Sequence, residues 1–246
     1  MHQFFVEKSQ VGKEYVTITG SDVNHIRNVL RMKIGETIRI SDREGGNYFC
    51  KIAETGENFV QADIVSVDEE GTELPSKIYL FQALPKGYRM ETVIEKAVEL
   101  GVYEIIPVAM KYCVVKLEGK KAAQRVQKWQ AQVETAAKQS KRSIIPKIHE
   151  VVSFKEALKL AENCDIRLVP YENENGMEGT RTVLEQIEPG KSISIMIGPE
   201  GGFAEEEIAK ARETMQSISL GRRILRTDTA GICMMSMLML QLESRI

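Results

Sequence analysis

The sequence of 246 residues predicts an α/β protein with a small β-barrel domain at its N-terminal end. Three observations lead to this fold class. The first 67 residues alternate between short β-rich runs and turns, while from residue 78 onward apolar strands alternate with helical patterns. Near the carboxyl end, two glycine-containing loops each follow an apolar run and precede a helical stretch.

The N-terminal segment contains one predicted helix among its strands. The helix covers residues 22–32, with Ser21 as N-cap and with Ile26, Val29 and Leu30 on one face. Short strands around a single helix predict a small barrel, and the strands are placed at residues 4–6, 15–18, 37–40, 48–52 and 59–65. An acidic segment with Pro and Gly, residues 68–75, predicts a linker between domains at 1–70 and 75–246.

The second domain is predicted to be a parallel sheet with helices on both faces. Ser153 and Glu156 form a capping box that opens one of its helices, residues 154–161. Other helices are predicted at 89–100, 119–140, 182–187 and 205–215, and strands at 78–83, 105–108, 166–169, 193–197 and 218–220.

The two glycine loops are the strongest candidates for a ligand site. They are Gly198-Pro199-Glu200-Gly201-Gly202 and residues 221–230, and both follow strands whose carboxyl ends share one edge of the sheet. Neither loop has the residues of a Walker phosphate loop or of a dinucleotide fingerprint. Three Glu residues, 205–207, open the next helix and would repel a phosphate, so we expect a ligand without one.

The charge distribution indicates RNA binding, although the net charge is only −2. Residues 111–147 contain ten Lys or Arg against two Glu, a concentration that suits a phosphate backbone. A solvated helix face is the alternative. Four scattered Cys and three scattered His give no metal-ligand spacing, so no metal is expected. No export signal and no apolar run of membrane-spanning length are seen, which predicts a cytoplasmic protein with no membrane partner.

The motifs GPEGGF (198–203) and LGRRILRTDTA (220–230) resemble the RsmE family of SPOUT methyltransferases. Further matching segments, in order, are HIRNVLR (25–31), ALPKG (83–87), EKAVELGV (95–102) and AAKQS (136–140). The resemblance implies methylation of uracil N3 in a uridine of 16S ribosomal RNA, with S-adenosylmethionine as cofactor. It also implies a C-terminal trefoil knot, a PUA-like N-terminal domain and a homodimer. The chain departs from the family pattern at Asp228, where Glu is usual, and at Ala204, where Ser or Thr is usual.

Three loops are expected to hold the cofactor, the third following the strand at 166–169. The apolar segment 233–240 is predicted to pack in the core and at a subunit interface. The expected cofactor-binding residues are Val169, Pro170, Tyr171, Gly198, Pro199, Glu200, Gly201, Gly202, Leu220, Gly221, Ile224, Leu225, Thr227 and Ala230.

Catalysis requires removal of the uracil N3 proton, or stabilisation of the uracil anion. Asp228 and Glu200 are candidate bases, and Arg226 is a candidate anion stabiliser. Asp228 is also placed as the cap of a helix that begins at Thr229. The expected RNA-binding residues are Arg27 and Arg31 on one helix face, with Lys86, Arg89, Lys138, Lys141, Arg142, Arg222 and Arg223.

Two other functions remain open at this point. A SPOUT enzyme that methylates a ribose 2′-OH of tRNA or rRNA would share the glycine loops. A non-catalytic factor for assembly of the small ribosomal subunit would use the barrel and the basic segment alone. The loops would then be tight turns, and the arginines would pair with Glu172 or Glu200 as scaffold.

Overall fold

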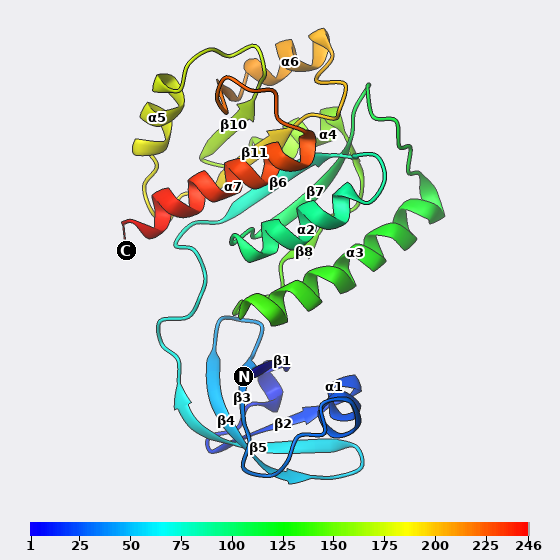
Figure 1. Ribbon diagram of the computed structural model, residues 1–246, viewed down its shortest axis with the longest axis vertical. Coiled ribbons are helices and arrows are strands. Elements are labelled where there is room, and N and C mark those ends of the chain that lie inside the picture. The colour runs from blue at the N-terminus through cyan, green and yellow to red at the C-terminus, as the bar shows by residue number, and fades with distance from the viewer. Residues whose placement is uncertain (246) are drawn as a thin grey trace. The chain divides into compact units, whose positions relative to one another are not determined.

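The structure, a computed structural model, describes residues 1–245 and divides into two compact units (Figure 1). Unit 1 consists of Met1–Glu73 together with Thr135–Ile145, and unit 2 of Leu74–Glu134 together with the chain from Pro146 onward. The boundary falls inside one long helix, α3 (Gly119–Ser140), which therefore supplies residues to both units. Its predicted span is confirmed.

Unit 1 is built on a five-stranded sheet with the order β1-β3-β4-β5-β2. The edge strand β1 runs parallel to β3 and the other pairs are antiparallel, which gives a half-barrel in place of the predicted small barrel. Alternate strand residues such as Ile38, Ile40 and Ile52 are fully buried and fill its interior. The strands are β1 (His2–Phe5), β2 (Tyr15–Thr19), β3 (Thr37–Ser41), β4 (Asn47–Thr55) and β5 (Phe59–Val67), and a short 3₁₀ turn, η1 (Lys8–Gln10), follows β1.

The helix of unit 1 is shorter than predicted. It consists of α1 (Ser21–Asn24), capped by Gly20 and not by Ser21, and of a wider π-helical turn, η2 (His25–Val29). It ends because Arg31 has a left-handed backbone, φ 53°, which no helix continues. The predicted apolar face is also wrong in part, since Val29 is exposed while Ile26 is fully buried.

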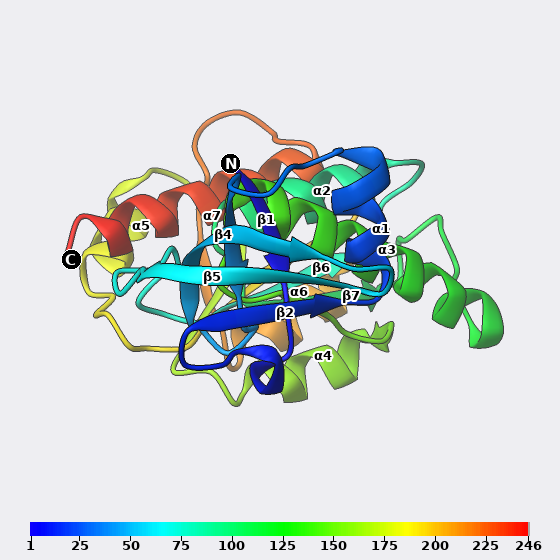
Figure 2. The ribbon, with the colours of Figure 1, turned by 90° about the horizontal axis from the view of Figure 1, so that it is seen from below.

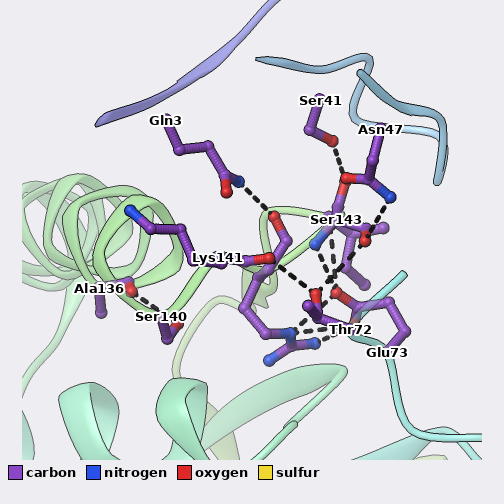
Figure 3. A network of polar contacts seen from close by, with 11 residues as sticks. Gln3, Ser41, Asn47, Thr72, Glu73, Ala136, Ser140, Lys141 and Ser143 are labelled. Atoms are coloured by element: carbon purple, nitrogen blue, oxygen red, sulfur yellow. Dashed lines mark hydrogen bonds and ion pairs between the residues drawn. The ribbon is translucent and has the colours of Figure 1, made fainter. Parts of the chain in front are cut away.

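A network of buried polar groups binds residues 135–145 to the rest of unit 1 (Figure 3). The guanidinium of Arg142 donates to both carboxylate oxygens of Glu73 over 2.5–3.0 Å, and the Ser143 N–H donates to the same carboxylate over 2.7 Å. Gln3 Nε2 donates to the Arg142 carbonyl over 2.6 Å, and Asn47 Nδ2 to Ser143 Oγ over 2.8 Å. Glu73, expected in a free linker, is thus part of the unit 1 scaffold.

Unit 2 contains a parallel sheet with the order β12-β10-β11-β6-β7-β8, and β9 pairs with β7. Within the described residues every strand pair of this sheet is parallel, and the central strand β11 is buried along its whole length, as expected for a sheet covered on both faces. The strands are β6 (Ile78–Ala83), β7 (Glu104–Ala109), β8 (Lys147–Ile148), β9 (Val152–Ser153), β10 (Ile166–Pro170), β11 (Ile193–Ile197) and β12 (Gln216–Ile218).

Helices cover both faces of this sheet. Figure 2 shows α2 and α7 on one side and α4 on the other, and α7 packs against α2, β11 and β6. The predicted α/β class is confirmed, but several boundaries differ from the prediction. α5 begins at residue 178 and not 182, α6 ends at Arg212 and not residue 215, β12 covers 216–218 and not 218–220, and α7 begins at Thr227 and not Thr229. The helices are α2 (Arg89–Glu99), α4 (Phe154–Ala161), α5 (Glu178–Glu185), α6 (Glu205–Arg212) and α7 (Thr227–Glu243).

The strand order brings three loops to one place. β10 lies between β11 and β12, and all three run in the same direction, so the loops that follow them meet at the carboxyl edge of the sheet.

No helix within residues 1–245 has the length and apolar character needed to cross a bilayer. The same residues contain no cluster of His, Cys, Asp or Glu that would ligate a metal ion.

Replacement of Arg142 by Ala is expected to destabilise the protein by about 3 kcal/mol, because it leaves the Glu73 carboxylate half-buried without its cation. Urea unfolding measures this change. Arg27→Ala, which removes an exposed arginine of the same unit, is the matched control and should change the free energy of unfolding by about 0.5 kcal/mol or less. Equal losses of unfolding free energy in the two variants would show that the Arg142–Glu73 pair stabilises the protein no more than an exposed arginine does.

Candidate functional site

A cavity of about 380 Å³ opens where the three loops of unit 2 meet. Its floor is apolar and includes Ile197 and Phe203, and its rim carries the arginines of the segment after β12. The volume lies within the range of roughly 300–1,000 Å³ typical of small-molecule sites. The lining residues are Arg89, Pro170, Tyr171, Glu172, Ile197, Gly198, Pro199, Glu200, Gly202, Phe203, Leu220, Gly221, Arg222, Arg223, Ile224, Leu225, Arg226, Thr227 and Ala230.

The Thr227 hydroxyl ties two of these loops together. It donates to the Gly198 carbonyl over 2.6 Å and accepts from Gln82 Nε2, at the end of β6, over 2.9 Å. Thr227 is the first residue of α7 and only 4% exposed, so these bonds are shielded from water. One side chain therefore joins the β6 end, the loop after β11 and the start of α7.

Gly202 allows the loop after β11 to pass close to the loop after β10. Its φ of +72° suits glycine, and a Cβ at this position would lie 2.7 Å from Glu172 Oε1. Any other residue would be strained and would displace the Glu172 side chain, which lines the cavity.

Arg89 lies between two carboxylates at the cavity wall. Its Nη1 is 2.5 Å from Glu200 Oε1, and its Nε is 4.0 Å from Asp228 Oδ1. The backbone N–H of Lys86 also donates to Glu200 Oε1 over 2.8 Å. Asp228 Oδ1 is buried and accepts no hydrogen bond from any group within residues 1–245. Arg89 is thereby held in one orientation, with one buried acceptor still available beside it.

The Glu200 carboxyl has a pKa below its ordinary value. Burial raises this pKa, but the hydrogen bonds from the Lys86 N–H and from its own N–H, with the Arg89 guanidinium, outweigh burial and lower it. Because the charged form is the stabilised one, Glu200 stays ionised through the neutral range and holds a proton weakly.

Most of the predicted cofactor residues lie at this cavity. Two do not line it: Val169 is fully buried in β10, and Gly201 is exposed, with its Cβ position 3.1 Å from Tyr112 Cβ. Those that line it are Pro170, Tyr171, Gly198, Pro199, Glu200, Gly202, Leu220, Gly221, Ile224, Leu225, Thr227 and Ala230.

Two of the three predicted catalytic residues line the cavity. They are Arg226 and Glu200, whereas Asp228 does not line it and lies 4.0 Å from Arg89 Nε. The capping role predicted for Asp228 is wrong, because α7 begins at Thr227, Arg226 is its N-cap residue, and Asp228 belongs to the first turn.

The predicted RNA-binding residues do not gather in one place. Arg89, Arg222 and Arg223 line the cavity, and the Lys86 side chain is exposed on the adjacent loop. Arg27 and Arg31 are exposed in unit 1, but they do not share a helix face, because the helix ends before Arg31.

Within the basic segment 111–147, residues 138, 141 and 142 form contacts inside unit 1. Lys138 Nζ is 3.0 Å from Asp22 Oδ1, and Arg142 is 3% exposed and bound by Glu73, so the structure gives Arg142 a scaffold role and leaves it inaccessible to RNA. Lys141 is half-buried with its Nζ on the Lys138 carbonyl. Burial, with Arg39 nearby, lowers the pKa of Lys141.

Several functional contacts carried no readable sequence signal. Gln82 reads as an ordinary strand residue, and Glu172 as one loop acid among several. Ala204, which lacks a capping hydroxyl, is compensated by Glu207, whose Oε2 accepts from the Ala204 N–H over 3.0 Å while Oε1 accepts from the Lys111 N–H over 2.8 Å. Only the sheet order reveals which of these side chains face one another.

Thr227→Val keeps the shape of the side chain but removes both hydrogen bonds of its hydroxyl. The Gly198 carbonyl would lose its donor, and Gln82 Nε2 would keep only its bond to the Ala83 carbonyl, so we expect a loss of about 1–3 kcal/mol in the free energy of unfolding. Thr229→Val makes the same change at an exposed position of α7 and is the matched control. Urea denaturation of both variants, with amide exchange in residues 198–203, tests the bridge; equal stability of the two variants would contradict it.

The chain is similar to known RNA methyltransferases along most of its length. A family model described as an RNA methyltransferase domain matches residues 72–239, and one described as an RNA methyltransferase PUA domain matches residues 18–65. The ribosomal RNA small subunit methyltransferase E of Bacillus subtilis is 34% identical, with 99% of this chain and 98% of the relative covered. That of Mesomycoplasma hyopneumoniae is 32% identical, covering 96% and 98%.

Among solved structures, the ribosomal RNA small subunit methyltransferase E of Neisseria gonorrhoeae bound to S-adenosyl methionine has a TM-score of 0.82 and 32% identity, covering 96% of this chain and 95% of that one. The similarity extends through both units. The predicted SPOUT-type α/β class with a PUA-like N-terminal domain is therefore confirmed, and the chain belongs to the ribosomal RNA small subunit methyltransferase E family.

Proposed function

We propose that the protein transfers the methyl group of S-adenosylmethionine to N3 of a specific uridine in the 16S ribosomal RNA of the small subunit. The observation that carries the proposal is the cavity formed by three loops at the carboxyl edge of the unit 2 sheet, in a chain of this family. We assign unit 1, which includes residues 135–145, to RNA binding and unit 2 to methyl transfer. The reaction belongs in the cytoplasm, where ribosomal RNA is made and assembled.

The residues at the cavity suit S-adenosylmethionine. The N–H groups of Ile224 and Leu225 donate to no partner within residues 1–245, and both residues line the cavity, so they are available to the polar edge of an adenine. The apolar floor suits its ring faces, and the carboxylates of Glu172 and Glu200 suit a cationic ligand. We propose that the twelve predicted cofactor residues at the cavity hold it and that Val169 and Gly201 shape the loops from behind.

The cofactor, when bound, supplies a methyl group that is already electrophilic. The protein's part is to place the uracil N3 in line with it and to manage the N3 proton. In the balanced reaction N3 gains the methyl group through a new N–C bond, the S–C bond breaks with its electrons kept by sulfur, and the N3 proton passes to an acceptor on the protein.

Arg89 and Arg226 are proposed to bind the uracil as its negative charge develops. Arg89 is well suited because Glu200 and Asp228 fix its guanidinium, so little reorganisation is needed during the reaction. Glu200 is a poor proton acceptor, since two donors already occupy its Oε1 and its pKa is lowered. We therefore assign Glu200 to positioning Arg89.

Asp228 is the proposed proton acceptor. Its Oδ1 is buried and free of hydrogen bonds within the described residues, and it lies 4.0 Å from Arg89 Nε. A uracil held by the fixed Arg89 guanidinium would therefore have its N3 proton close to this oxygen.

Asp228→Asn removes the acceptor without changing the size of the side chain. We expect kcat to fall roughly 100-fold or more, because general base catalysis typically contributes 10²–10⁴. Asp228→Glu, which keeps the carboxylate and restores the residue usual in the family, is the matched control and should retain most activity. Initial rates on small-subunit particles measure kcat. A full rate in the Asn variant would remove Asp228 from proton transfer.

The exposed residues proposed to bind RNA are Arg222 and Arg223 at the cavity rim, Lys86 on the adjacent loop, and Arg27 and Arg31 of unit 1.

We also propose a homodimer through the outer face of α7. Cys233, Met237 and Leu240 recur there at helical spacing, and Leu240 is 69% exposed. An apolar stripe of this kind is typical of a helix that meets a partner.

Methylation of small-subunit particles from a strain that lacks the enzyme tests the function. We expect 3-methyluridine after nucleoside digestion and mass analysis, and saturable heat on titration with S-adenosylmethionine. A 2′-O-methylated nucleoside would instead identify a ribose methyltransferase. Absence of both heat and methyl transfer would leave a non-catalytic RNA-binding factor.

A further inference from the structure

A second cavity, of about 240 Å³, lies in unit 2 between the loop after β6 and the first half of α3. Its walls are apolar: Leu84 and Met90 come from the β6 side, Val115 and Leu117 from the segment before α3, and Trp129 from α3 itself. Its volume is below the range of roughly 300–1,000 Å³ typical of sites for larger ligands, and suits a single planar ring.

The rim of this second cavity is basic. Lys121, Arg125 and Lys128 recur at intervals of four and three residues, which places them on one face of α3. Arg125 is paired with Glu91, its Nη2 lying 2.6 Å from Glu91 Oε1. Lys121 and Lys128 are exposed, and neither ammonium lies within ion-pair distance of a carboxylate of residues 1–245. Two cations thus stand beside an apolar recess.

The second cavity is close to the methyl-transfer site. Arg89 lines the first cavity and its neighbour Met90 lines the second. In the loop before α2, the Lys86 N–H holds Glu200, while Pro85 and Gly87 line the second cavity. The loop and the start of α2 therefore form the partition between the two cavities.

We propose that the second cavity binds the base of an unpaired nucleotide that flanks the target uridine, with Lys121 and Lys128 at its phosphate. This inference rests on the proposed function, because it needs an RNA whose target base occupies the first cavity. An apolar recess that accepts a ring, beside unpaired cations, is the combination by which proteins hold single-stranded RNA. Recognition of a neighbour would help select one uridine among many.

Charge reversal tests the phosphate contacts. Lys121→Glu with Lys128→Glu is compared with Lys155→Glu and Lys159→Glu, a matched pair of exposed lysines on α4. The probe is the unmodified single-stranded RNA around the methylated uridine, without methyl donor. We expect the first pair to lose roughly tenfold or more in affinity, and the magnitude of its slope against log salt to fall by about 0.7, since both lysines serve one phosphate and a single-strand phosphate contributes about 0.7. Equal losses in both pairs would overturn the proposal.

A filled cavity tests the base contact. An abasic ribose placed at each flanking position should weaken wild-type binding at one position, by roughly tenfold. In Leu117→Trp, which fills the recess without changing charge, that abasic penalty should vanish, because the two changes remove the same contact. A full abasic penalty in the filled variant, or a wild type that does not bind this RNA, overturns the inference.

The result is separable from the proposed function. If wild type transfers methyl to particles from S-adenosylmethionine while the second cavity fails these tests, only the nucleotide site falls. If wild type binds no S-adenosylmethionine and transfers no methyl group, the methyltransferase proposal falls, and the nucleotide site, which rests on it, falls with it. A change of oligomeric state in Leu117→Trp alone would assign the recess to a second copy of the chain and overturn the proposal.

Discussion

The hydroxyl of Thr227 is the contact on which the geometry of the first cavity depends. A parallel sheet brings loop starts together, but it does not fix how the loops then run, since loops carry few backbone hydrogen bonds of their own. Here one buried side chain joins the loop after β11, the end of β6 and the beginning of α7. Because its donor and its acceptor are both used, movement of any of these segments breaks a bond that water does not replace.

Charge in unit 2 is arranged around the partition between the two cavities. The guanidinium of Arg89 is paired with Glu200, and Asp228 lies near it without a hydrogen bond. Its orientation is therefore fixed while some of its N–H donors remain available to a substrate. Lys121, Arg125 and Lys128 of α3 line the other side of the same partition, and of these three only Arg125 is paired with a carboxylate of residues 1–245. A polyanion would therefore meet fixed charge at the reacting base and mobile charge beside it, which is a sensible division between catalysis and binding.

Sequence patterns predicted those parts of the fold that depend on local chemistry. The spans of α3 and β11 and the capping box at Ser153 follow from apolar periodicity and from one hydroxyl. Predictions failed where a distant contact decides the outcome. Arg142 looks like a member of a basic stripe, but a glutamate many residues earlier takes it into the interior.

The candidate site shows the same division. Two glycine loops after strands are readable as a ligand edge, and twelve of the fourteen predicted cofactor residues lie at the cavity. The helix start at Thr227 was placed two residues late, because its cap uses no side-chain hydrogen bond that a sequence would display. Arg89 could be assigned only to RNA contact, since its two carboxylate neighbours are brought to it by the sheet order.

The membership of residues 135–145 in unit 1 has a consequence for synthesis of the chain. Gln3, Ser41 and Asn47 are buried, and each bonds to Arg142 or Ser143, which leave the ribosome much later. A nascent N-terminal sheet therefore has polar groups that stay in water until α3 has been made. Unit 1 can therefore be completed only after residues 74–134 of unit 2 have been synthesised, and not in the usual order from the amino end.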